Sequence, residues 1–165
     1  MINFRQIEKA IVDGLQSRIS EAGITCPVIR ANQTAPVPPY PYVSYTVTQP
    51  IVSDSKGYSE AKDKTRFKTL SQVWSITVQS KDDEEALNIA MIAYDWFSIE
   101  GNTYLSDNNI VVQRVMNVTT RDNLLSIEYE YRKGFDVFFD LVHEISQTEE
   151  QASGYIETVE FSKEV

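Results

Sequence analysis

Side chains suited to catalysis are few in this chain of 165 residues, which holds one histidine, His143, and one cysteine, Cys26. A histidine acts as a general base only beside a nucleophile that it can deprotonate and a group that orients it. His143 has Glu144 next to it in the sequence but no nucleophile motif nearby. Cys26 precedes Pro27 in an apolar stretch, where a small buried core residue is expected. The sequence therefore predicts no catalytic site and no enzymatic activity.

Metal and cofactor chemistry lack the residues they need. A single cysteine excludes an internal disulfide and a thiolate metal cluster. Four consecutive acids occupy residues 82–85, but consecutive helical side chains point in different directions and cannot converge on one cation. These acids suit the positive end of a helix dipole. The chain has no glycine-rich phosphate loop, so the sequence predicts neither a metal nor a cofactor.

The overall charge also limits the kinds of partner that the protein can bind. The 24 acidic and 15 basic residues give a net charge of −9. Sequence-independent binding of duplex DNA needs clustered Lys and Arg side chains. The basic groupings are Lys64, Arg66, Lys68, Arg114, Arg121, Arg132 and Lys133. These are too few for a nucleic-acid site on an acidic background. No apolar run reaches the roughly 20 residues of a membrane span, so we expect a cytoplasmic protein without a membrane partner.

The segment over residues 35–45 concentrates prolines and tyrosines and then continues into a strand. Its prolines favour extended backbone, and the Pro38–Pro39 and Tyr40–Pro41 bonds are the best candidates for cis geometry. Tyrosine is enriched at protein interfaces, which makes Tyr40, Tyr42 and Tyr45 candidate interface residues. The alternative is ordinary packing of these rings against the first helix. A proline-rich peptide-ligand role is a third alternative, although the strand that follows favours an ordered loop.

Hydrophobic periodicity predicts the elements that position these side chains. We expect a first helix over 4–22, a second helix that Ser80 caps and Gly101 ends, and strands over 25–30, 43–48, 66–79, 110–118 and 124–141. Asn3 and Gln6 are placed to cap the first helix, and Gly23 to end it. Gly14 within that helix suggests close packing.

Three connections carry further expectations. Residues 49–65 lack a periodic apolar face and are interpreted as a mobile hairpin tip or a plain solvated loop. Residues 121–123 are expected to form the turn between the last two strands. Gly134 is expected to interrupt the last strand as a bulge or bend.

The fold class that follows is α+β, with a mixed or antiparallel sheet of about four to five strands flanked by two main helices. Residues 1–145 form one domain in this interpretation, and residues 146–165 form an acidic linker and a strand-like arm. The arm carries the candidate interface residues Tyr155, Ile156, Val159 and Phe161. It either adds to a neighbouring subunit or folds back on its own sheet, and the sequence leaves both alternatives open.

Taken together, the order of these motifs resembles the phage neck or tail terminator proteins of phages, prophages and phage-tail-like bacteriocins. The resemblance covers residues 1–142. It rests on the first helix, the Pro-Tyr-Pro-Tyr-Val-Ser-Tyr stretch at residues 39–45, the Trp74 strand, the acid-capped helix, and the Tyr-Arg-Lys-Gly-Phe-Asp-Val stretch at residues 131–137. That last stretch adds Arg132, Lys133 and Phe135 to the interface candidates.

The resemblance implies a structural role without catalysis. Such proteins close into a ring, usually hexameric, on the head-proximal end of the tail tube and stop its polymerisation. The implied partners are other copies of the chain, the tail tube protein, the sheath protein if the tail contracts, and head connector proteins. DNA passes through the lumen in this picture. Assembly would take place in the host bacterial cytoplasm, and the product would be part of the virion or tail-like particle.

Two other functions fit the same sequence. A head–tail connector or adaptor would bind the portal side and not the tail tube. A small cytoplasmic binding module would use the tyrosine-rich segment as a ligand groove and would stay monomeric. An enzyme that depends on His143 is the weakest alternative, since no spacing in the chain supports it.

Overall fold

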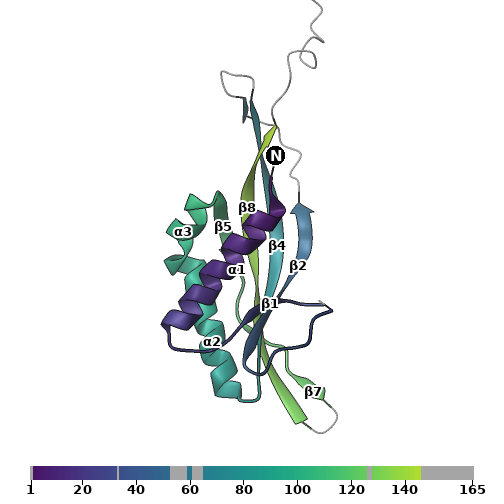
Figure 1. Ribbon diagram of the computed structural model, residues 1–165. Coiled ribbons are helices and arrows are strands. Elements are labelled where there is room, and N and C mark those ends of the chain that lie inside the picture. Colours follow the sequence, from purple (N-terminus) through teal and green to yellow (C-terminus); the bar gives the residue numbers. More distant parts are fainter. Residues whose placement is uncertain (1, 33, 53–58, 61–64, 126–127, 146–165) are drawn as a thin grey trace, which may run out of the picture.

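A computed structural model describes residues 2–32, 34–52, 59–60, 65–125 and 128–145, and it has the α+β architecture expected from the sequence (Figure 1). The described residues contain eight strands, three α-helices and one π-helical turn. The helical elements are α1 (Phe4–Glu21), α2 (Asp83–Asp95), η1 (Trp96–Glu100) and α3 (Asn102–Asp107). The strands are β1 (Val28–Arg30), β2 (Tyr42–Val52), β3 (Ser59–Glu60), β4 (Arg66–Ser80), β5 (Ile110–Val115), β6 (Thr119–Thr120), β7 (Asn123–Leu125) and β8 (Glu128–Ile145).

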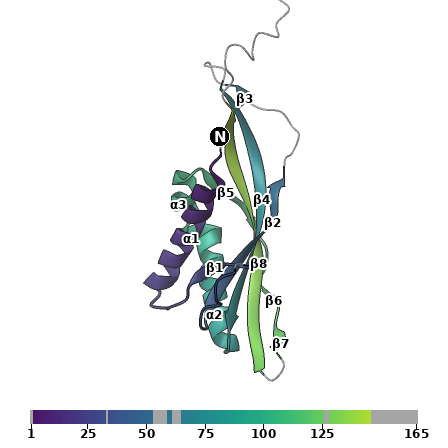
Figure 2. The same cartoon turned by 45° about the vertical axis from the view of Figure 1, so that its right-hand side comes forward.

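The sheet is mixed, and two long strands form its centre. Its order is β1-β2-β4-β8-β5, with β3 beside β4 and with β6 and β7 beside β8. Among the described strands, β1 and β2 alone run parallel. The β4–β8 pair keeps one uninterrupted register from Arg66 opposite Ile145 to Ser80 opposite Tyr131. This pair extends past the helices at the end that carries β3, whereas at the other end β4 leads into α2 and the hairpin of β7 and β8 projects (Figure 2).

All three helices cover the same face of the sheet (Figure 2). The alternation predicted for the tryptophan strand is confirmed: Trp74, Ile76 and Val78 are buried, and Ser75 and Thr77 lie on the opposite, polar face. Their cross-strand partners follow the same rule, since Ile76 pairs with the buried Phe135. The hydrophobic core therefore lies between the sheet and the helices.

Helix α1 begins and ends as predicted. The side chain of Asn3 accepts a 3.2 Å hydrogen bond from the Gln6 N–H, and Gly23 has a φ of 77°. Gly14 allows the close packing that its position suggested. A Cβ at Gly14 would lie 2.6 Å from the Tyr104 ring and 2.7 Å from the Trp96 ring. Helix α1 thus packs directly against η1 and α3.

The second helical region differs from the prediction in two ways. The N-cap of α2 is Asp82, which accepts a 2.7 Å bond from the Glu85 N–H, whereas Ser80 is the last residue of β4. Gly101 does not end the helical region. A π-helical turn follows α2, and α3 begins after Gly101. A Cβ at Gly101 would lie 2.5 Å from the Trp96 ring, so the glycine is required by the packing of that ring.

The predicted turn at residues 121–123 is wrong. Strands β5, β6 and β7 lie in succession along β8, and Leu125 at the end of β7 pairs with Glu128 at the start of β8. The reason is that residues 121–123 are held to β8. The Arg121 N–H donates to the Arg132 C=O at 2.7 Å, and the Asp122 carboxylate accepts a 2.8 Å bond from the Arg132 N–H.

The bulge expected at Gly134 is also wrong, because the register between β4 and β8 is unbroken there. A Cβ at Gly134 would lie 2.7 Å from the Ile76 carbonyl and 2.9 Å from Nη1 of Arg121. The glycine therefore allows the Arg121 side chain to lie flat over the sheet.

The remaining boundaries shift modestly. Strand β2 runs to Val52 with two register shifts against β4, which confirms the hairpin predicted between them. The Tyr40–Pro41 bond is the one cis bond among the described residues, so Pro38–Pro39 is trans. Most of the predicted mobile loop between β2 and β4 (53–58 and 61–64) and the whole arm at residues 146–165 lie outside the described residues.

Candidate functional site

Two of the candidate tyrosines meet Arg132 around one buried carboxylate. The Tyr40 hydroxyl donates a 2.7 Å hydrogen bond to Glu130, and Nε of Arg132 donates to the same carboxylate at 2.6 Å. The rings of Tyr40 and Tyr42 stack with centroids 5.4 Å apart. The hydrogen bond to Glu130 and burial together raise the pKa of Tyr40 to about 12. This cluster joins the proline-rich segment to β8.

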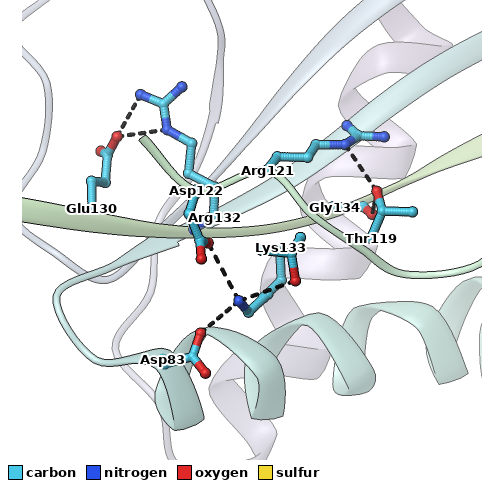
Figure 3. Close-up of polar contacts among 9 residues, drawn as sticks. Asp83, Thr119, Arg121, Asp122, Glu130, Arg132, Lys133 and Gly134 are labelled. Carbon is cyan, nitrogen blue, oxygen red and sulfur yellow. Dashed lines mark hydrogen bonds and ion pairs between the residues drawn. The ribbon is translucent and has the colours of Figure 1, made fainter. Parts of the chain in front are cut away.

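Lys133 lies beneath this cluster on the helix side of the sheet and is almost fully buried (Figure 3). Its Nζ lies 2.5 Å from the Asp83 carboxylate and 3.3 Å from the Asp122 carboxylate. Burial alone would lower the pKa of Lys133, but the two carboxylates raise it above its ordinary value. The amine therefore links β8 to the first turn of α2 and to the connection between β6 and β7.

Arg121 occupies the polar face, opposite the helices. Its guanidinium donates to the hydroxyls of Ser75 at 2.7 Å and Thr77 at 3.2 Å, and it pairs with Asp136 at 3.1 Å. Nε donates to the Thr119 hydroxyl at 3.3 Å (Figure 3). Arg121 thus connects three neighbouring strand segments, and its charge is compensated within the subunit.

These three clusters anchor a projecting hairpin, formed by β7 and the first residues of β8. Two apolar side chains on it are exposed, Leu124 at 65% and Tyr129 at 55%. The ring of Tyr129 lies 5.7 Å from that of Tyr131. Exposed apolar side chains grouped on a projecting element are typical of a contact surface. We refer to Leu124, Tyr129 and Tyr131 as the hairpin tip.

Two interface candidates lie in the core instead. Phe135 is 1% exposed, and Tyr45 is 6% exposed. The Tyr45 hydroxyl donates a 2.6 Å bond to Glu8 of α1, and its ring stacks on Trp74 with centroids 5.0 Å apart. This matches the packing against the first helix that the sequence left open as an alternative. Both side chains are buried within the subunit and support the fold.

The remaining interface candidates fall into two groups. Tyr40, Tyr42, Arg132 and Lys133 are already engaged within the subunit, as described above. Tyr155, Ile156, Val159 and Phe161 lie outside the described residues. Sequence reasoning missed Leu124, Tyr129 and Tyr131, because all three were assigned to one long strand. A correctly placed turn would have exposed Leu124 and Tyr129 at a strand end.

The cysteine lies in the core and the histidine lies in a central strand. Cys26 is 1% exposed, and burial raises the pKa of its thiol to about 12. His143 lies within β8 opposite Lys68, and not after the end of a strand as expected. The described part of the chain holds no group of three or more His, Cys, Asp or Glu side chains that could bind a metal ion. None of its helices is both long and apolar enough to cross a membrane.

Comparison with known families gives a match over almost the whole chain. A family model described as phage neck terminator protein matches residues 9–164. The match confirms the resemblance found in the sequence and extends it through the C-terminal arm. No curated protein matches the chain.

Proposed function

The chain belongs to the phage neck terminator family, a structural family of the phage tail, and from that premise we propose that it forms a ring, of six copies, on the head-proximal end of a tail tube. The ring stops polymerisation of the tube and provides the surface on which the neck is completed. If the tail contracts, the same ring also holds the last sheath subunits.

The observation that carries this proposal is the shape of the central strand pair. β4 and β8 continue past the helical layer at one end, and the β7–β8 hairpin projects at the other, so each subunit presents two projecting ends and the open edges of a sheet (Figure 2). A closed ring needs two different, complementary surfaces on each subunit. An elongated sheet with open edges offers such surfaces without any change in the core.

The hairpin tip supports a contact with a tail component. Leu124 and Tyr129 expose apolar surface at one end of the strand pair, while the charges behind them are paired within the subunit. An apolar patch on a rigid base loses little conformational entropy on binding. We assign this tip to the tail tube or, in a contractile tail, to the sheath.

The acidic composition suits a ring through which DNA passes. The net charge of −9 repels a polyanion and limits its adhesion to the lumen. Other partners in this proposal are the head connector proteins on the opposite side of the ring.

The test is the mass of the purified protein by light scattering behind a sizing column, with negative-stain imaging, alone and mixed with tail tubes. We expect either a ring of about six subunits or a monomer that becomes a ring on tube ends. A protein that stays monomeric and never binds tube ends would contradict the proposal. Binding to portal or connector proteins but not to tubes would identify a head–tail connector instead.

A further inference from the structure

The far end of β8 has an open edge. Strand β5 begins at Ile110, which lies opposite Leu141. Beyond that point, among the residues that the structure describes, β8 pairs with β4 alone as far as Ile145. An unpaired strand edge is a template on which another extended chain can add.

The backbone groups that face this edge can be identified from the hydrogen bonds further along β8. The C=O of Asp136 accepts a 2.8 Å bond from the Met116 N–H, so the even-numbered residues of β8 point toward the β5 side. The C=O of Arg132 follows the same rule with the β6–β7 connection. Because the register between β8 and β4 is unshifted, the alternation continues to the end of the strand. The N–H and C=O groups of Val142 and Glu144 therefore face the open edge.

A groove of about 300 Å³ runs along this edge. Both views place the N-terminal end of α1 beside the end of β8 (Figures 1 and 2). The apolar residues that line the groove are Ile2 before α1, Ile7 of α1, Phe67 of β4 and Val142 of β8. Asn3, Gln6 and Glu144 add polar groups beside them. Asn108 and Asn109 add amide groups where β5 begins. The groove can hold the apolar side chains of an added strand while the edge binds its backbone.

The opposite edge of the sheet is less suited to strand addition. Strand β1 covers β2 only as far as Tyr45, and a second groove of about 200 Å³ lies between Phe4 and Ile51. However, β2 carries Pro50 and two register shifts in this part. Proline lacks a donor and irregular register interrupts pairing, and both features protect edges from addition. The end of β8 is the regular edge with a groove beside it.

We propose that the edge groove at residues 142–145 receives residues 155–161 of a neighbouring copy, added to β8 as an extra strand. This inference rests on the proposed ring. In an extended chain Tyr155, Glu157, Val159 and Phe161 point to one side, so three of the four side chains on this face are apolar. These three match the apolar residues of the groove.

The length of the linker favours a neighbour over a return within the same chain. Nine residues, 146–154, separate the end of β8 from the segment. Hairpin loops commonly use about two to five residues, so this linker is longer than a hairpin needs. Fully extended, it spans up to about 30 Å. Each copy would then give one arm and receive one, which is a heterologous contact that closes a ring.

A disulfide cross-link in the full-length protein tests the pairing. The variant Val142→Cys with Val159→Cys places one thiol at the groove and one on the arm. Val37→Cys with Val159→Cys is the matched control, because Val37 is also exposed but lies in the proline-rich segment, outside the groove. Both proteins are oxidised mildly, alone and with tail tubes, and separated on non-reducing gels. Cys26 is retained, since it is buried.

We expect covalent multiples of the chain from the Val142 pair, at least tenfold more than from the Val37 control. A cross-link confined within single chains would show that the arm binds its own chain and not a neighbouring copy. Equal cross-linking in both variants, or none, would overturn the groove as the docking site. Ring mass and binding to tube ends are measured on the same samples. A ring that forms and caps tubes without the cross-link would refute this inference alone, whereas loss of ring and capping in the unmodified protein would refute the proposed function as well.

Discussion

Tyr40 and Glu130, 90 residues apart in the sequence, are joined by a 2.7 Å hydrogen bond from the phenol to the carboxylate. Glu130 is 3% exposed and also binds Arg132. If a buried carboxylate loses a hydrogen-bond donor, the free-energy cost of its burial is no longer fully offset by hydrogen bonds. This bond therefore holds the proline-rich segment on the sheet.

Tyr40→Phe should lower the free energy of unfolding by about 1–2 kcal/mol, because it removes a hydrogen bond to a buried charged group. Denaturant titration followed by tryptophan fluorescence measures the change. Tyr129→Phe is the matched control, since that ring is exposed, and its effect should stay within about 0.5 kcal/mol. Equal effects in the two variants would show that the bond to Glu130 contributes no stability.

The same bond predicts a dependence on alkaline pH. The pKa of Tyr40 is raised to about 12 from its ordinary value of 10.0, so the contribution of the bond to stability is complete below pH 10 and is lost as the pH rises toward 12. Unfolding titrations at several values across this window should show stability falling in the wild-type protein. The Tyr40→Phe variant should show a shallower fall, and a parallel fall in both proteins would contradict the prediction.

Gly134→Ala should destabilise the protein by about 1–3 kcal/mol, because the added methyl group meets the Ile76 carbonyl, which cannot move without disturbing the ladder. Gly23→Ala is a useful contrast. It meets nothing within 4 Å, and only its φ of 77° opposes the substitution, at about 1–2 kcal/mol. Melting temperatures should fall in both variants, but only Gly134→Ala should also disturb the hydrogen exchange of β4 and β8. Unaltered exchange in these strands would argue against the close approach at Gly134.

Lys133→Met should cost about 1–3 kcal/mol of stability, because it leaves Asp83 and Asp122 without their shared cation. Lys9→Met removes a lysine from an exposed ion pair with Asp13 and should have no measurable effect. Chemical denaturation of both variants provides the comparison. If Lys133→Met leaves the stability unchanged, the free-energy cost of burying the amine equals the stabilisation from its ion pairs with Asp83 and Asp122.

Leu124→Asp should abolish binding to tail ends while leaving the melting temperature unchanged, because Leu124 is exposed on the hairpin tip. Leu87→Asp on α2 is the control, since it places the same charge at another exposed leucine. Negative-stain counts of capped tube ends give the readout. If the Leu124→Asp variant caps tube ends fully, the hairpin tip does not take part in the contact with the tail.

The elements that the sequence predicted correctly have signals that are local. Asn3 and Gly23 determine the limits of α1 through their own caps, and Trp74 and Ile76 alternate with polar residues because one face of β4 is covered. Such signals depend on neighbours within one or two turns or on period-two burial, and both are visible in a single sequence.

The errors arose where distant contacts decide the local structure. Gly101 resembles a helix stop, but it is a glycine because the Trp96 ring packs on it, so α3 was missed. Residues 121–123 have turn composition, but Arg132 holds them on β8. The candidate site shared this error. Leu124 and Tyr129 appeared to belong to one strand, and only the true position of the turn places them together at the tip.

The unbroken ladder between β4 and β8 has a mechanical consequence. Its fifteen paired positions run along about 50 Å of strand, from the projecting end beside β3 to the base of the β7–β8 hairpin. A pull applied at opposite ends loads all these hydrogen bonds in shear, and they must break together. The same bonds would open one at a time if the strands were peeled from one end. The subunit is thus suited to resist tension along this axis.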